Sequence, residues 1–208
     1  MDHTVKKDYA HSMARPRAFD EEQVLHAVRE QFWSAGYAAT SLDDLLRASG
    51  LGKGSLYGAF GDKRQLFLRA LRSYTERVHE ELRASLATGR ALTALRRFLE
   101  SPIDEPDDTG ARRGCLLANS TCELSSADPE VLEHAHRAYE TSTTLIAACI
   151  ARAQEEGDLP PETDPTVLAR SLLAAQQGVL FMSRTGMDTA TLTATARSLA
   201  DRLLPARD

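Results

Sequence analysis

Four residues with small or polar side chains follow a glycine-containing bend at residues 50–52. They are Lys53, Gly54, Ser55 and Tyr57. Lysine can donate hydrogen bonds to guanine O6 and N7, and tyrosine can contact a thymine methyl group or a phosphate. Glycine lets a backbone bend sharply and come close to a partner. These residue types therefore favour recognition of a nucleic-acid surface.

A short helix on each side of the bend would hold these residues in position. The first helix is expected to begin after Thr40 or Ser41, and the second to cover residues 53–60. Leu56 and Phe60 are four residues apart and face inward, which leaves the polar face outside. Such a pair is a helix-turn-helix, whose second helix can enter a DNA major groove about 12 Å wide.

The rest of the chain repeats apolar residues at helical spacing. It shows no convincing alternating run and no hairpin dipeptide between β-branched segments, so we predict an all-α fold of about nine helices. The acidic, proline-containing stretch 101–110 is the clearest internal loop. Beyond the helix pair, helices are expected from residue 19 to the glycine at 36, after residue 62, over 91–100, over 114–124, after residue 128, over 166–184 and over 189–204.

Charge separates a mildly basic N-terminal end from an acidic body. The 208 residues have a formal net charge of −5. Residues 1–72 contain 11 basic and 9 acidic residues, and the remainder contain 14 and 21, so only the N-terminal end is expected to meet a polyanion. No stretch approaches the roughly 18 apolar residues of a membrane helix, and no signal-peptide pattern is present. We therefore expect a cytoplasmic protein with no membrane partner.

The run TSLDDLLRASGLGKGSLYGAFGDKRQLF at residues 40–67, preceded by FDEEQVLHAVREQFWSAGY, resembles the N-terminal domain of the tetracycline-repressor (TetR/AcrR) family. The matching details include a first helix ended by glycine, Thr-Ser at the second, Gly-x-x-x-x-x-Leu-Tyr in the third, and Phe-x-x-Lys-x-x-Leu-Phe after it. The resemblance implies a homodimer that binds double-stranded DNA and is released by a small-molecule effector. The expected parts are a flexible basic arm (1–17), a helix-turn-helix domain (18–64) and an effector-binding and dimerisation domain (65–208).

The resemblance also assigns positions that contact DNA. Thr40 corresponds to a phosphate-contacting helix cap, and Lys63 to a phosphate contact in the first turn of the next helix. Gly58 and Ala59 depart from the family, which often has larger residues there, and are expected to lower affinity. Arg17 either contacts DNA or lies in a solvated tail. The expected contacts are Arg17, Thr40, Ser41, Lys53, Gly54, Ser55, Tyr57 and Lys63.

The C-terminal part contains candidate pocket residues but no catalytic grouping. The GCLxxN run at residues 114–119 resembles an effector-domain helix in one branch of the family. Its cysteines either pack in a core, line a pocket, or form a reactive thiol whose pKa Arg112 and Arg113 would lower. The candidates for the effector pocket are Cys115, Asn119, Cys122, His134, Tyr139, Gln177 and Phe181.

The last two helices are expected to form the dimer interface. The helix at 166–184 is apolar on two sides, so one side can face its own subunit and the other a partner. The alternative is a fully internal helix. The expected interface residues are Leu168, Leu172, Ala175, Val179, Leu192, Ala196, Leu199 and Leu203.

These features predict a ligand-responsive transcriptional regulator, most simply a repressor of a near-palindromic operator. An activator using the same module is the alternative within the class. A helical carrier protein that uses its pocket without DNA, and then a helical enzyme, are the alternatives outside it. No catalytic residues, metal site or cofactor are expected: the acidic loop lacks the spacing of a calcium site, and His134 and His136 do not share a helix face. The effector, the operator and the target genes cannot be inferred from the sequence.

Overall fold

The computed structural model describes residues 19–100, 112–124 and 127–204. Within these ranges the chain forms nine helices and no strand, which confirms the all-α prediction. The predicted loop at 101–110 and the arm with Arg17 lie outside the described residues. The helices are α1 (Glu21–Ala35), α2 (Leu42–Ser49), α3 (Lys53–Phe60), α4 (Lys63–Ala87), α5 (Ala91–Glu100), α6 (Leu116–Leu124), α7 (Pro129–Glu155), α8 (Pro165–Ser183) and α9 (Thr189–Leu203).

Local sequence signals determine where the first helices begin and end. The carboxylate of Asp20 accepts the backbone N–H groups of the first turn of α1, and Ser41 and Asp62 begin α2 and α4 with reciprocal capping boxes. Gly50 ends α2 at φ 66°, in the left-handed region that favours glycine. These caps fix the three short helices that precede α4.

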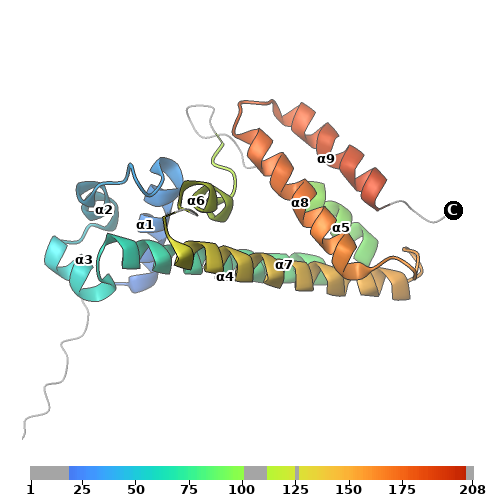
Figure 1. Ribbon diagram of the computed structural model, residues 1–208, viewed down its shortest axis with the longest axis horizontal. Helices are drawn as coiled ribbons and strands as arrows, with labels where there is room; N and C mark the ends of the chain where they lie inside the picture. The colour runs from blue at the N-terminus through green and yellow to red at the C-terminus, as the bar shows by residue number, and fades with distance from the viewer. Residues whose placement is uncertain (1–18, 101–111, 125–126, 205–208) are drawn as a thin grey trace, which may run out of the picture.

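Two long helices, α4 and α7, run side by side and connect the two ends of the molecule (Figure 1). At one end, α1, α2 and α3 surround the start of α4; at the other, α5 and α8 pack on the long helices, and α9 packs on α5 and α8. Separate apolar cores occupy the two ends. The first core contains Phe32 of α1 and Phe67 of α4 and extends to Leu116 and Val131, so it includes residues from both sides of the predicted domain boundary at residue 64.

The structure corrects part of the predicted interface on α8 and α9. Leu172, Val179, Leu192 and Ala196 are buried inside the subunit, because α8 and α9 pack on each other and on the α5–α7 layer. Leu168, Ala175, Leu199 and Leu203 are half-buried against the same cores. The four buried residues therefore stabilise the subunit and do not form its outer surface, whereas the four half-buried ones stay a predicted part of the interface. The exposed side of α8 is a different strip that includes Val167 and Phe181, which are 59% and 66% exposed.

At the first turn of α7 the buried apolar residue is Val131, which is fully buried, whereas the adjacent Leu132 is 48% exposed.

Candidate functional site

The helix-turn-helix is held from below by apolar residues and leaves one face of α3 open. Leu45 of α2 and Leu56 and Phe60 of α3 are buried in the first core. Gly52 starts α3 without a side-chain cap. The geometry of two short helices joined across a glycine bend is the one predicted from the sequence.

The outer face of α3 carries the residues predicted to contact DNA. Lys53, Gly54 and Ser55 are exposed, and Tyr57 is half-buried with its ring packed against the first core. A Cβ atom added at Gly54 or Gly58 would meet no other atom within 4 Å. The face is therefore low and uncluttered, which suits close approach to base edges.

Two neighbouring positions behave differently from each other. Thr40 is 1% exposed and its hydroxyl donates to Gly36 O over 2.6 Å, so it holds the α1–α2 turn and is not the helix cap that was predicted. The cap is Ser41, which is exposed.

Lys63 lies in the first turn of α4 with its Nζ 4.4 Å from the ring centroid of Tyr37. This cation–π contact keeps a positive charge next to a helix N-terminus, where a phosphate would bind.

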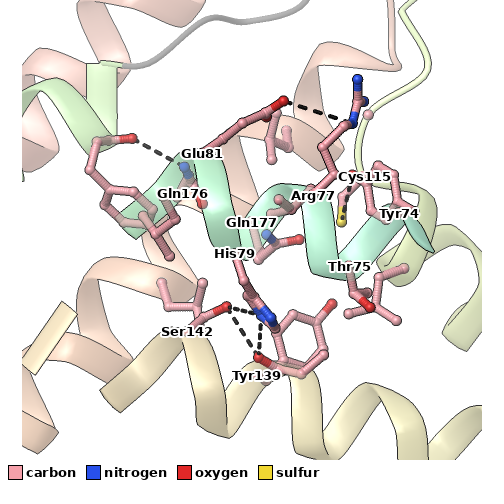
Figure 2. Close-up of a pocket in the computed structure, with 18 of the residues that line it drawn as sticks. Tyr74, Thr75, Arg77, His79, Glu81, Cys115, Tyr139, Ser142, Gln176 and Gln177 are labelled. Atoms are coloured by element: carbon pink, nitrogen blue, oxygen red, sulfur yellow. Dashed lines mark hydrogen bonds and ion pairs between the residues drawn. The ribbon is translucent and has the colours of Figure 1, made fainter. Parts of the chain in front are cut away.

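A cavity of about 360 Å³ lies between the two ends of the molecule. Its walls come from α1 and from each helix from α4 to α8 (Figure 2). The lining includes aromatic side chains (Trp33, Tyr74, Phe98 and Tyr139) and polar ones, among them His79, Ser142, Gln176 and Gln177. A cavity of this size, mainly apolar with a few polar groups, is typical of small-molecule sites.

Three of the seven predicted pocket residues line this cavity, namely Cys115, Tyr139 and Gln177. The other four do not. Phe181 is on the outer surface of α8, and His134 is bonded to Thr75 between α4 and α7. Asn119 and Cys122 lie on α6 and line a separate hollow against α1, whereas Cys115 precedes the helix. The side chain of Asn119 is hydrogen-bonded to Arg113 O and to Arg184.

The lining residues on α1 and α4 were not predicted from the sequence. Trp33 lies in the DNA-binding part of the sequence, yet it lines the cavity and packs edge-on against Tyr74 at 5.1 Å. His79 places its Nε2 3.1 Å from Ala138 O and 3.2 Å from Ser142 Oγ on α7. A histidine within a mainly apolar helix stripe was the available signal for a polar site on α4.

The surroundings of Cys115 differ from those of a thiolate paired with arginine. Tyr74 donates its hydroxyl to Cys115 Sγ over 3.7 Å. Arg113 lies over the ring of Trp33 and pairs with Glu30, and Arg112 donates to Met187 O and to the hydroxyl of Thr189. Both guanidinium groups are thus engaged with other partners.

Polar contacts join the segment around α6 to the DNA-binding helices. Trp33 Nε1 donates to Gly114 O over 3.1 Å. At the other end of α6, Glu123 accepts the backbone N–H groups of Tyr37 and Ala38 over 3.0 and 2.7 Å. Since Gly114 and Leu117 line the cavity, the same segment contacts both the cavity and the DNA-binding helices.

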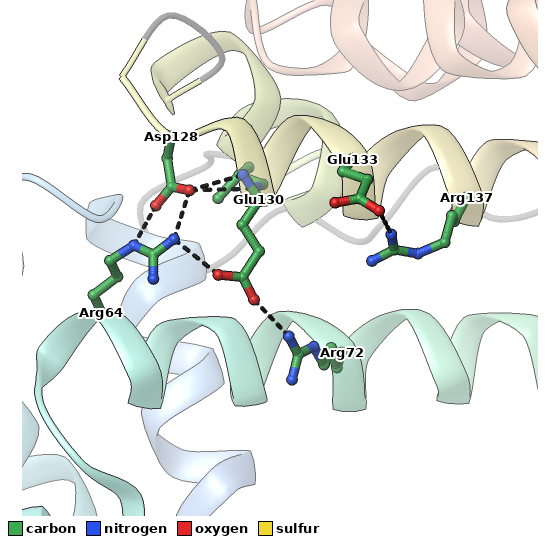
Figure 3. Close-up of polar contacts among 7 residues, drawn as sticks. Arg64, Arg72, Asp128, Glu130, Glu133 and Arg137 are labelled. Atoms are coloured by element: carbon green, nitrogen blue, oxygen red, sulfur yellow. Dashed lines mark hydrogen bonds and ion pairs between the residues drawn. The ribbon is translucent and has the colours of Figure 1, made fainter.

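A second connection links the start of α4 to the start of α7 (Figure 3). Arg64 donates to both carboxylate oxygens of Asp128, over 2.7 and 2.8 Å, and to Glu130 over 2.9 Å. Arg72 donates to the other oxygen of Glu130 over 2.7 Å. The Arg64 guanidinium holds the pKa of the Asp128 carboxyl below its ordinary value of 3.8, so the pair is charged at neutral pH.

Two negative findings apply to the described residues. No helix there is long and apolar enough to cross a membrane. No group of three or more His, Cys, Asp or Glu side chains in the same ranges is arranged to hold a metal ion.

Comparison with known proteins identifies related transcriptional regulators over most of the chain. Residues 24–70 match the family described as bacterial regulatory proteins of the tetR family, and residues 91–199 match the tetracyclin repressor-like C-terminal domain. An uncharacterized regulator of Bacillus subtilis, YezE, is 33% identical over 178 residues, 85% of this chain and 92% of its own. The Escherichia coli repressor ComR is 28% identical over 84% of each chain.

Solved structures share the fold. A TetR-family regulator from Cytophaga hutchinsonii superposes with a TM-score of 0.79 at 25% identity, covering 89% of this chain and 94% of its own. A cysteine-substituted CifR bound to double-stranded operator DNA superposes with a TM-score of 0.80 at 26% identity, covering 92% of this chain and 100% of its own. These matches confirm the predicted family and its helix-turn-helix fold. The chain belongs to the tetracycline-repressor (TetR) family of bacterial transcriptional regulators.

Proposed function

We propose that this protein is a homodimeric repressor that reads its operator with α3 and leaves it when a small molecule fills the cavity. The open outer face of α3, with Lys53, Gly54 and Ser55 exposed above a buried Leu56, is the observation that carries this proposal. The operator complex of CifR and the repressor activity named for ComR support it.

The exposed strip of α8 is the surface that we assign to the dimer. Val167, Ser171, Ala174, Gly178 and Phe181 are exposed and follow one another at alternating spacings of four and three residues. Small residues at its centre allow two copies of the helix to approach closely, with the large side chains at the ends. Phe181→Glu is expected to convert the dimer to a monomer in analytical ultracentrifugation, because it puts a charge into this seam. A dimer of unchanged affinity would show that the interface lies elsewhere.

Two sets of contacts can transmit occupancy of the cavity to α3. A ligand between α4, α6 and α7 would displace the α6 segment, which contacts α1 through Gly114 and Glu123. It would also contact α4. The first turn of α4 follows α3 directly and is joined to α7 by the hydrogen bonds between Arg64 and Asp128. The effector acts only to the extent that it binds the released conformation more tightly than the DNA-bound one.

The test is binding of the DNA upstream of the protein's own gene, measured by fluorescence anisotropy from 50 to 200 mM salt. Regulation predicts sequence-preferring binding whose affinity falls steeply with salt, because phosphate contacts release counterions. Failure to prefer any duplex over random DNA would favour the alternative, a helical carrier that uses its cavity without DNA.

A further inference from the structure

The cavity wall contains many hydrogen-bond donors, but protein acceptors already occupy most of them. Ser142 Oγ donates to Ala138 O over 3.1 Å, and Gln176 Nε2 donates to Phe98 O over 3.1 Å. His79 Nε2 lies 3.1 Å from the same Ala138 carbonyl, which can only accept, so this nitrogen carries its hydrogen there. The other occupied donors are Trp33 Nε1 on Gly114 O, the Tyr74 hydroxyl on Cys115 Sγ, and Thr75 Oγ1 on Arg72 O.

Three lining side chains remain without a hydrogen-bond partner in the described part of the chain: Tyr139, Gln177 and Ser85, and of these Ser85 is exposed to solvent. The oxygen of Gln177 is buried and has no hydrogen-bond partner, and its amide nitrogen is also unpaired, so this side chain has a donor and an acceptor left for a ligand. Burial raises the pKa of the Tyr139 hydroxyl, which therefore stays protonated and able to donate. Figure 2 shows Tyr139 and Gln177 beside the same stretch of α4, Tyr139 coming from α7. The unpaired groups of the interior wall thus include two donors, the Tyr139 hydroxyl and the Gln177 amide nitrogen, beside the amide oxygens of Gln176 and Gln177 as acceptors.

The charges on the wall are confined to its rim. Arg77 and Glu81 are the formally charged residues among the described lining residues, and their side chains are 46% and 65% exposed and pair with each other over 3.7 Å. An ionic ligand would lose its hydration inside without an opposite charge to replace it. The aromatic rings of Trp33, Tyr74 and Phe98 favour a flat apolar body. Since an apolar cavity of roughly 150 Å³ accommodates benzene, about 360 Å³ has room for two fused rings and a substituent.

We propose that the cavity binds an uncharged aromatic compound with a carbonyl group that accepts hydrogen bonds from Tyr139 and Gln177. This inference rests on the proposed function only in taking the cavity as the effector site. It assigns Tyr139 and Gln177 the task of selecting among apolar ligands of one size.

The experiment titrates the full-length wild-type protein with four naphthalene derivatives by isothermal titration calorimetry. The probes are 2-acetonaphthone, which offers a carbonyl acceptor, 2-isopropenylnaphthalene, which has the same shape without it, 2-naphthol, a strong donor, and 2-naphthoate, an anion. Quenching of Trp33, the single tryptophan of the chain, reports that the probe is in the cavity. We expect the ketone to bind about tenfold more tightly than its hydrocarbon analogue, the contribution of one or two buried hydrogen bonds, and more tightly than the naphthol or the anion.

Two variants locate the selectivity. Tyr139→Phe and Gln177→Met each remove one donor while keeping most of the side-chain volume, and each should lower the ketone-to-hydrocarbon ratio towards one. The hydrocarbon affinity serves as the internal control for an intact cavity. If a variant does not fold, the wild-type ratio still decides.

Four results would overturn the inference: equal binding of ketone and hydrocarbon, a preference for the naphthol, a preference for the naphthoate, or no binding of any probe. All four leave operator binding unaffected. A wild-type protein that binds the ketone as expected but recognises no DNA would instead contradict the proposed function.

Discussion

The DNA-facing surface and the cavity of this protein are built in opposite ways. The surface comes from one eight-residue helix, α3, whose exposed residues adjoin one another in the sequence. The cavity takes its walls from six helices and from residues as far apart as Trp33 and Leu180. A long regular ligand such as duplex DNA needs one open helix face, whereas a small molecule must be enclosed from several sides. The first kind of site is local in the sequence, and the second depends on the packing of the whole chain.

The largest effect that this comparison predicts is on α3 itself. Lys53→Ala should weaken operator binding by about 1–3 kcal/mol, roughly 5- to 150-fold, and relax base preference, because it removes a donor to base edges. Competition anisotropy with operator duplexes that carry single base changes measures both quantities.

Lys63→Ala is the matched control, since Lys63 lies beside a helix N-terminus and is expected to contact phosphate. It should weaken binding to all sequences alike and lower the salt slope by about 1. Equal, sequence-blind losses from both variants would mean that α3 is not the reading helix.

The next largest effect is on stability, through the ion pair between Arg64 and Asp128 that joins the starts of α4 and α7. Asp128→Asn keeps a side-chain acceptor for the first turn of α7 but removes the charge that pairs with Arg64. Because Arg64 is 43% exposed, we expect a loss of about 1–2 kcal/mol in the free energy of unfolding at pH 7, measured by urea denaturation. The folded pKa of Asp128 is lowered, so this contribution is present above 3.8 and is lost as pH falls below it.

Asp164→Asn provides the matched control. Asp164 also precedes a proline and caps α8 through two backbone N–H groups, but no arginine pairs with it among the interactions of the described residues. Its substitution should cost no more than a few tenths of a kcal/mol. Similar losses at the two positions would show that Asp128 acts only as a helix cap.

A smaller effect is expected from the glycines of α3. Gly58→Ala should stabilise the protein by about 0.5–1 kcal/mol in thermal unfolding, because the added methyl group meets open space and glycine is a poor helix former. Gly54→Ala should stabilise the free protein similarly but weaken operator binding, since its Cβ would fill the face that approaches DNA. Unchanged DNA binding by Gly54→Ala would place the contact surface elsewhere.

The helix limits and the inward-facing residues of the helix-turn-helix were predicted from the sequence almost residue by residue. The caps at Ser41 and Asp62 and the inward Leu56 and Phe60 follow from signals within a few residues of one another. The role of Thr40 was not predicted, because its hydroxyl donates a hydrogen bond back to Gly36 O. The local pattern does not decide which of the two adjacent hydroxyl residues caps the helix.

The cavity could be predicted only in part. Cys115 was predicted from the GCLxxN run, and Tyr139 and Gln177 were predicted as polar or aromatic side chains within apolar helices. Trp33 was missed because its role depends on how α1 packs on α4, which no spacing within α1 reveals. Similarly, Phe181 was assigned to the pocket because apolar periodicity marks both sides of α8 and does not say which side is inside.

The smallest expected differences are in the reactivity of the three cysteine thiols. Cys122 is exposed, Cys115 is half-buried at the cavity wall, and Cys149 is buried with its pKa raised by that burial. Labelling with iodoacetamide, followed by mass spectrometry, should modify Cys122 first, then Cys115, then Cys149. Cys115 reacting faster than Cys122 would support the hypothesis of a thiol sensor, which the engagement of Arg112 and Arg113 elsewhere does not favour.

The most direct test of the account is selection of bound sequences from a random duplex pool by the wild-type protein, with Lys53→Ala run in parallel. A dimer that presents two α3 helices predicts enrichment of an inverted repeat, with half-sites about 10 base pairs or a multiple of this apart, and loss of that repeat in the variant. Enrichment of no common sequence, or of the same repeat by Lys53→Ala, would contradict the central claim that α3 reads DNA.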